Sequence, residues 1–304
     1  MNAGYYWITI SVSVLLGMAW MAARANKRGM KTAPVFIGTA LGAALAFLLA
    51  KTLYVALMAG KVWPRYGVRS FLRMDETEFS FLGGCLGMVL GMALTAKRFK
   101  IRSGLLLSAF APAGALMAAG ARAAEGFLGM QGVGKYVEID AFARPPFAVS
   151  NEWGEWYWAI FLLSALAALI VAAVFAFSKK EDAIVSLRFE RTVYYLCVPQ
   201  IFCESLRSMG MRWGFVRAEQ VLCAVVIVGL LVYGCLQTHP QGFFRRFGPV
   251  LGAFVSIAAI VGVEFGLDKT NLPPLFWYGV MVTALINFGV MEHIVTGRRL
   301  RQAR

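Results

Sequence analysis

The sequence predicts an all-α polytopic membrane protein, and three observations support this fold class. Of its 304 residues, 59% are hydrophobic and only 15% are charged, and the mean hydropathy is +0.66. That apolar share exceeds the share found in soluble domains. Apolar runs of about 20 residues, the length that crosses a bilayer, recur along the chain. The basic residues gather in short clusters between these runs.

Each expected helix is an apolar run bounded by charge clusters or by Gly and Pro residues. The runs cover residues 4–23, 34–58, 79–96, 104–124, 154–177, 192–208, 219–236, 248–266 and 274–294. These runs predict nine helices.

The positions of Lys and Arg predict the orientation, because basic loops stay on the cytoplasmic side. With the N-terminus outside, every second loop is basic: the clusters lie within 24–31, 97–102, 179–191, 245–246 and 298–304. We therefore expect an external N-terminus and a cytoplasmic C-terminus. The same distribution argues against a nucleic-acid partner despite the net charge of +14, since the charges do not line one face.

The sequence predicts no metal and no cofactor. Its five cysteines all fall within apolar runs and lack the spacing of metal ligands. We interpret them as small packing residues.

Ionisable residues near the outer ends of the runs are the first candidates for a site, because such residues usually face a cavity or one another. Arg122 and Glu125 close the fourth run, Glu155 opens the fifth, and Glu204 and Arg207 end the sixth. Each Arg–Glu pair is three residues apart, so it can pair on one helix face. The alternatives are internal ion pairs with snorkelling arginines, or an anion site in which two arginines clamp a phosphate. At the outer leaflet the anion would be a phospholipid head group.

Residues 79–91 read FSFLGGCLGMVLG and place glycines at two kinds of position. Gly83, Gly87 and Gly91 are four apart and form a ridge that allows close helix packing. Gly84 lies off this ridge, which favours close approach of something else, such as a ligand.

Several stretches together resemble the bacterial prolipoprotein diacylglyceryl transferases. They are YYWIT followed by ARAN, SFLGGCLG from Ser80 to Gly87, GARAAEGF, VSNEWGE and ESLR, in that order within residues 4–236. The resemblance implies that residues 1–236 form a seven-helix membrane core with its N-terminus outside, in a bacterial cytoplasmic (inner) membrane. Residues 237–304 would add a two-helix membrane segment that has no counterpart in this core. The same resemblance implies transfer of the diacylglyceryl group of phosphatidylglycerol to a lipobox cysteine, with release of glycerol phosphate.

The resemblance also implies roles for individual residues. Arg122 and Arg207 would hold the phosphate, Tyr6 would position the head group, and Gly83, Gly84 and Glu204 would complete the substrate site. Either Glu125 or Glu155 would remove the acceptor's proton.

Two positions depart from the family pattern. Leu82 stands where the family has a histidine, and Glu125 stands where it has an asparagine. The main expectation is a transferase that uses phosphatidylglycerol or another anionic phospholipid and a prolipoprotein acceptor. The alternative is a non-catalytic phospholipid-binding or assembly protein derived from that fold. A transporter is disfavoured, because the inner halves of the runs lack matching charges.

Overall fold

The computed structural model describes residues 3–27, 31–178, 184–214, 216–238, 242–270 and 272–303. It contains two compact units, which are described separately below. The first comprises Met1–Lys179, Val185–Thr192 and Leu206–Met211, and the second comprises Lys180–Ile184, Val193–Ser205 and Arg212–Arg304.

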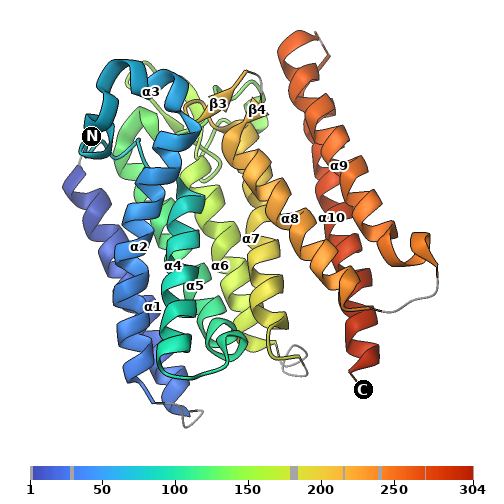
Figure 1. Ribbon diagram of the computed structural model, residues 1–304. Helices are drawn as coiled ribbons and strands as arrows, with labels where there is room; N and C mark the ends of the chain where they lie inside the picture. Colours follow the sequence, from blue (N-terminus) through green and yellow to red (C-terminus); the bar gives the residue numbers. More distant parts are fainter. Residues whose placement is uncertain are drawn as a thin grey trace. The chain divides into compact units, whose positions relative to one another are not determined.

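The first unit is a bundle of helices that run alongside one another (Figure 1). The helices are α1 (Ala3–Lys27), α2 (Ala33–Leu57), α4 (Phe81–Arg98), α5 (Ser103–Ala124) and α6 (Ile160–Phe177), with the short α3 (Ala59–Tyr66). Helix α1 packs on α5, α2 on α4, and α5 on α6. Three 3-10 helices, η1 (Gly67–Phe71), η2 (Glu125–Gln131) and η3 (Asp140–Phe142), lie in the connections.

The glycine ridge of α4 packs against α2, as the spacing predicts. A Cβ atom at Gly83 would lie 2.6 Å from the carbonyl oxygen of Leu49, and one at Gly87 would overlap the backbone of Ala46. The two helices therefore approach at backbone distance. Ser80 precedes α4, and its Oγ accepts a hydrogen bond from the Gly83 N–H (3.2 Å), which is a standard N-cap.

The predicted helix 154–177 begins later than expected, because its first residues form a strand. Strand β1 (Ala148–Ser150) pairs antiparallel with β2 (Trp156–Trp158), and α6 starts only at Ile160. On its other side β2 bonds residues 134–137, with the Gly134 N–H donating to the Trp158 carbonyl (2.7 Å). This pairing commits the backbone of Trp156–Trp158 to a small sheet. Glu155 therefore lies in a turn and does not open a helix.

The second unit contains α8 (Ala218–Leu236), α9 (Phe243–Lys269) and α10 (Pro274–Gln302), together with part of α7 (Leu187–Leu206). A two-stranded sheet of β3 (Arg212–Trp213) and β4 (Val216–Arg217) precedes α8. Helices α9 and α10 form a hairpin (Figure 1), in which Asn287 Nδ2 donates to the Gly252 carbonyl (3.0 Å) and to Ser256 Oγ (2.8 Å).

Helix α8 packs on both α9 and α10 in the second unit. The predicted boundary after residue 236 stays a prediction. Gln220 Nε2 of α8 also donates to Glu264 Oε1 of α9 at 2.7 Å. Such a buried hydrogen bond between helices stabilises their packing in an apolar environment.

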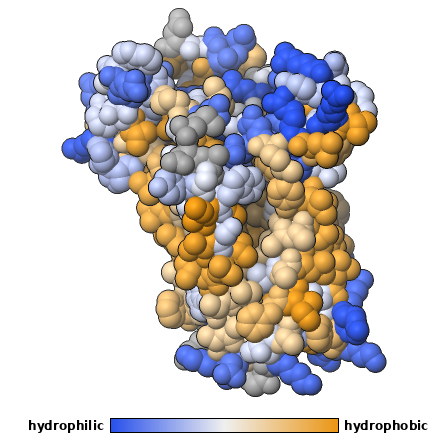
Figure 2. Space-filling model, turned by 90° about the vertical axis from the view of Figure 1, so that its left-hand side faces the viewer, coloured by the Kyte–Doolittle hydropathy of each residue, from blue (hydrophilic) through white to orange (hydrophobic). Residues whose placement is uncertain are grey.

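The protein is a mostly helical, multi-pass membrane protein. Among the described residues, seven helices are long and apolar enough to cross a membrane: Gly4–Lys27, Ala33–Leu57, Ser103–Gln131, Ile160–Phe177, Ala218–Leu236, Phe243–Lys269 and Pro274–Gln302. Helices α4 and α7 form at predicted positions but are not among these seven. Seen from the side of α1 and α2, hydrophobic residues lie between two hydrophilic ends (Figure 2).

The predicted orientation depends partly on residues whose structure is not described. Arg28, Lys179, Lys180 and Arg304 contribute to the basic clusters, and all four lie outside the described residues. The orientation therefore stays a prediction.

Candidate anion site

A largely buried carboxylate, that of Glu125, lies between two arginines in the first unit. Arg122 Nη1 donates to Oε1 of Glu125, and Arg207 Nη2 donates to Oε2 of the same residue at 2.8 Å. The exposed fractions of the side chains are only 3% for Arg122, 11% for Arg207 and 13% for Glu125. The predicted pair of Arg122 and Glu125 is confirmed. Arg207 reaches the same carboxylate from a distant part of the chain.

Local backbone structure brings Arg122 and Glu125 together. Arg122 lies in the last turn of α5, and Glu125 is the first residue of η2, which continues directly from α5. Their spacing of three residues places both side chains on one face of the helix end. A Cβ atom at Gly132 would overlap the carbonyl of Glu125, so only a glycine lets the chain fold back over this point.

Arg207 is positioned by backbone pairing just after the end of α7. Gly134 forms an antiparallel bridge with Arg207, and the Lys135 N–H donates to the Leu206 carbonyl (2.7 Å). Ser208 Oγ donates to the Val133 carbonyl at 3.0 Å. A Cβ atom at Gly134 would lie 2.7 Å from the Leu206 oxygen, so the pairing requires glycine here. The segment 133–135 thus directs Arg207 toward Glu125.

The ring of Phe81 covers one face of the Arg122 guanidinium, with 3.7 Å between Cζ and the ring centroid. This is a cation–π contact, and it leaves the in-plane N–H groups of the arginine for acidic partners. Phe81 is the first residue of α4 and belongs to the FSFLGG stretch. Phe81 is not among the residues predicted for the site. The available signal was its place directly before Leu82, where the resembling family has a histidine.

Tyr6 also belongs to this cluster. Its side chain is buried against Ala124 and Leu128, the residues on either side of the Glu125 position. Its hydroxyl interacts electrostatically with Glu125, Arg122 and Arg207. The structure therefore brings together four of the predicted site residues, from α1, from the junction of α5 and η2, and from the segment after α7.

The two predicted glycines have different surroundings. Gly83 faces the backbone of Leu49 and Ala50, which leaves no space for a ligand, so helix packing explains it. A Cβ atom at Gly84 would meet only the Cβ atom of Ala50, at 4.0 Å. Space beside the α4 backbone thus remains at Gly84.

Glu155 and Glu204 have other surroundings. Glu155 is exposed in the turn between β1 and β2, and its Oε2 accepts hydrogen bonds from Asn151 Nδ2 (2.7 Å) and the Tyr157 hydroxyl (2.9 Å). The hydrogen bond to Glu155 raises the pKa of Tyr157. Glu204 belongs to the second unit, where Gln200 Nε2 donates to its Oε1 at 2.8 Å.

A second buried ion pair, which sequence reasoning did not predict, lies in the first unit. Lys51 Nζ of α2 is 2.8 Å from Oε2 of Glu78, and the side chains are 5% and 10% exposed. Arg73 Nε lies 3.5 Å from the other oxygen of Glu78. A lysine inside an apolar run and the acidic stretch DETE (75–78) were the sequence signals. Arg73 Nη2 also lies 3.8 Å from Oδ2 of Asp75, so two carboxylates face the two cations. These ion pairs tie the loop to α2.

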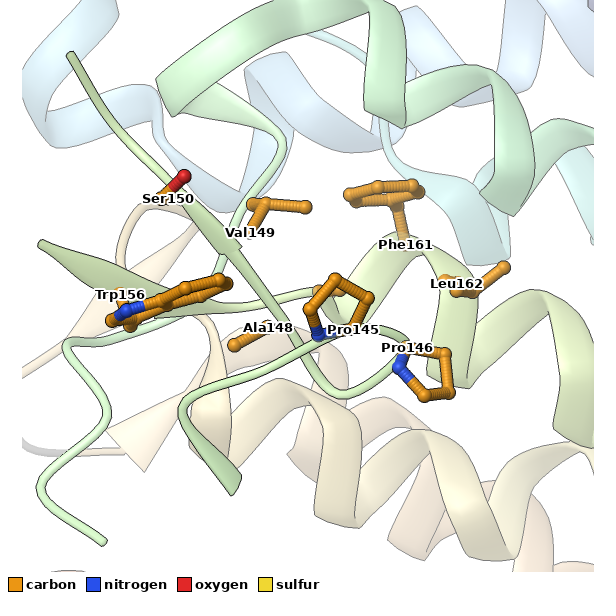
Figure 3. Close-up of a pocket in the computed structure, with 9 residues that line it drawn as sticks. Pro145, Pro146, Ala148, Val149, Ser150, Trp156, Phe161 and Leu162 are labelled. Atoms are coloured by element: carbon orange, nitrogen blue, oxygen red, sulfur yellow. The ribbon is translucent and has the colours of Figure 1, made fainter. Parts of the chain in front are cut away.

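An apolar cavity of about 370 Å³ lies beside β1 and the start of α6 (Figure 3). Its lining consists of Pro145, Pro146, Ala148, Val149, Ser150, Trp156, Ala159, Phe161 and Leu162, and none of these described residues is charged. Phe161 also packs against η2, since a Cβ atom at Gly126 would lie 2.8 Å from its ring. The cavity thus suits a hydrocarbon group, and one aromatic ring separates it from the residue after Glu125.

Comparisons with known proteins identify no relative. No family model matches the chain, and no curated protein or solved structure matches it significantly. Within the described residues, no group of three or more His, Cys, Asp or Glu side chains could hold a metal ion.

Proposed function

We propose that this protein binds an anionic phospholipid through Arg122 and Arg207 and transfers the lipid's diacylglyceryl group to an acceptor. The observation that carries the proposal is the convergence of two buried arginines, from separate parts of the chain, on a single carboxylate. A phosphodiester head group such as that of phosphatidylglycerol carries one negative charge on two oxygens, and arginine guanidinium groups bind such oxygens in pairs.

The surroundings of the cluster favour a lipid over a free phosphate. The first unit presents an apolar surface between hydrophilic ends, and the apolar cavity beside Phe161 offers space for hydrocarbon. Phosphatidylglycerol or another anionic phospholipid is therefore the expected partner, with a prolipoprotein cysteine as the expected acceptor through the resemblance. The proposed location is a bacterial cytoplasmic membrane, with the site toward the outer leaflet.

The proposed reaction is a nucleophilic substitution at the glyceryl carbon. The acceptor loses a proton to a base and attacks this carbon, while the carbon–oxygen bond to the phosphate breaks. The electron pair stays with the departing glycerol phosphate, and Arg122 and Arg207 stabilise its charge. Tyr6 would orient the head group. Glu125 is the favoured base because it lies in the cluster, whereas Glu155 bonds Asn151 and Tyr157 in the exposed turn.

A non-catalytic phospholipid-binding or assembly protein is the second candidate. The observation that favours it is Leu82, which is buried beside Phe81 and offers no titratable group. Such a protein would bind the lipid phosphate through Arg122 and Arg207 (the arginine clamp) and would not react with it.

Purified protein in phosphatidylglycerol liposomes with a lipobox peptide separates these candidates. The transferase releases glycerol phosphate, and we expect Arg122→Ala to reduce the rate by about 100-fold or more. Arg69→Ala, which removes an exposed arginine from η1, is the matched control and should keep the wild-type rate. Binding without release, abolished by Arg122→Ala, would establish the second candidate. Equal binding by wild type and Arg122→Ala would refute both.

A further inference from the structure

We propose that Glu125 holds the place of the lipid phosphate until the lipid binds, and that the phosphate then releases Glu125 to act as the base. This inference rests on the proposed function. It goes beyond naming Glu125 as the base, because it makes proton removal depend on a lipid phosphate being bound between Arg122 and Arg207.

The geometry of the ion cluster supports this substitution of one anion for another. Arg122 bonds one oxygen of the Glu125 carboxylate and Arg207 bonds the other. A phosphodiester also presents two oxygens that share one negative charge, and arginine N–H groups recognise both kinds of anion. A phosphate that takes these two N–H donors must displace Glu125 from at least one of them.

Displacement changes the chemistry of the carboxylate. Glu125 follows the buried Ala124, and only 13% of its own side chain is exposed. A buried carboxylate that has lost its cations is costly, so it favours its neutral form and takes up a proton. Tyr6, which packs against Ala124 beside Glu125, brings a hydroxyl donor to this cluster that would hold the released side chain.

The reaction sequence is balanced without any further reactant. The phosphate fills the clamp, and Glu125 accepts the proton of the acceptor thiol. The sulfur electron pair forms the new bond to the glyceryl carbon, and the electrons of the broken carbon–oxygen bond leave with glycerol phosphate. When this product departs, Glu125 gives its proton to water and returns between Arg122 and Arg207. With a lipid that has no anionic head group, Glu125 would stay bonded to Arg122 and Arg207 and could not act as the base.

The key experiment compares wild type, Glu125→Gln and Glu138→Gln in phosphatidylcholine nanodiscs that contain a titrated fraction of phosphatidylglycerol. Glutamine keeps the shape of Glu125 but removes the competing charge, so we expect phosphatidylglycerol to bind about tenfold more tightly or better. Loss of the base should lower glycerol phosphate release by about 100-fold. Glu138→Gln removes an exposed charge from the same unit and should change neither quantity.

The outcomes separate this inference from the proposed function. If wild type binds and transfers while Glu125→Gln binds no more tightly, the displacement is wrong and the transferase stands. If Glu125→Gln binds more tightly but releases product at the wild-type rate, Glu125 is not the base. If neither protein binds phosphatidylglycerol, the proposed function itself fails. Should Glu125→Gln not fold, Glu125→Asp replaces it. The shorter side chain withdraws the carboxylate from the two arginines, so it competes less with the lipid phosphate, and phosphatidylglycerol should again bind more tightly.

Discussion

At the residue scale, the ring of Phe81 fixes the orientation of the Arg122 guanidinium. The ring centroid lies 3.7 Å from Cζ, which restricts the arginine to one plane and directs its N–H groups sideways toward Glu125. A guanidinium held this way needs little reordering when another anion takes the place of the carboxylate. The aromatic residue at the start of α4 is therefore part of the anion site.

Phe81→Leu should weaken phospholipid binding. It removes the π face but keeps an apolar side chain, and the lost cation–π contact is worth about 0.5–2 kcal/mol. Phosphatidylglycerol titration in nanodiscs should show the corresponding fall in affinity, whereas Phe81→Trp should retain binding. Phe79→Leu is the control, since the Phe79 ring lies 5.1 Å from Lys51 instead. Unchanged affinity in Phe81→Leu would mean that the ring only packs.

The sequence predicts which residues form the site better than it predicts their partners. Arg122 and Glu125 pair as their spacing of three residues implies. Arg207 bonds Glu125 as well, and it does so from another part of the chain. This contact depends on the pairing of Gly134 with the backbone after α7, which involves residues more than 70 positions apart. A local spacing rule contains no information on such a contact.

At the element scale, the pairing of α2 and α4 depends on glycines whose neighbours are backbone atoms. Backbone atoms cannot move aside as a flexible side chain can. Gly84 and Gly87 are only three residues apart, but their neighbours differ. The same substitution should therefore have opposite effects at the two positions.

Gly87→Ala should destabilise the first unit, while Gly84→Ala should leave it unchanged or more stable. The Cβ atom of the first would overlap the backbone of Ala46, and overpacking of this kind costs about 1–3 kcal/mol. The Cβ atom of the second lies 4.0 Å from Ala50, an ordinary contact, and alanine favours a helix by about 1 kcal/mol over glycine. Thermal unfolding in one detergent measures both. Equal melting temperatures would show that α2 and α4 are not packed as described.

Apolar runs predict the helices but not the small sheet. Trp156–Trp158 read as the aromatic entry of a membrane helix, because aromatic residues gather at membrane interfaces. In the structure their backbone groups bond β1 and residues 134–137. Aromatic residues are also favoured in strands, so the choice depends on which partners the fold supplies. The partners, β1 and residues 134–137, precede Trp156–Trp158 in the sequence, and a periodicity read over one apolar run does not include them.

At the scale of the whole molecule, the number of membrane crossings follows from α4 and α7. Among the described helices, seven meet the length and apolarity of a span, and α4 and α7 would bring the number to nine. If both of these helices cross, or neither does, the number is odd and the chain ends lie on opposite sides of the membrane. If only one of them crosses, the number is eight and the ends lie on the same side. The two alternatives differ in where the loops before and after α4 lie.

Cysteine labelling in intact spheroplasts tests the proposed orientation and the crossing by α4 together. In a background with the five native cysteines replaced by alanine, Leu72→Cys, Phe99→Cys and Asp140→Cys each introduce one thiol at an exposed position of the first unit. Positive-inside orientation predicts that a membrane-impermeant maleimide labels positions 72 and 140 directly, and position 99 only after permeabilisation. Labelling of 72 and 99 from the same side would mean that α4 does not cross. Labelling of position 99 alone from outside would show that the orientation is the reverse of the predicted one. The Arg122–Arg207 clamp would then lie toward the cytoplasmic leaflet, away from the proposed acceptor.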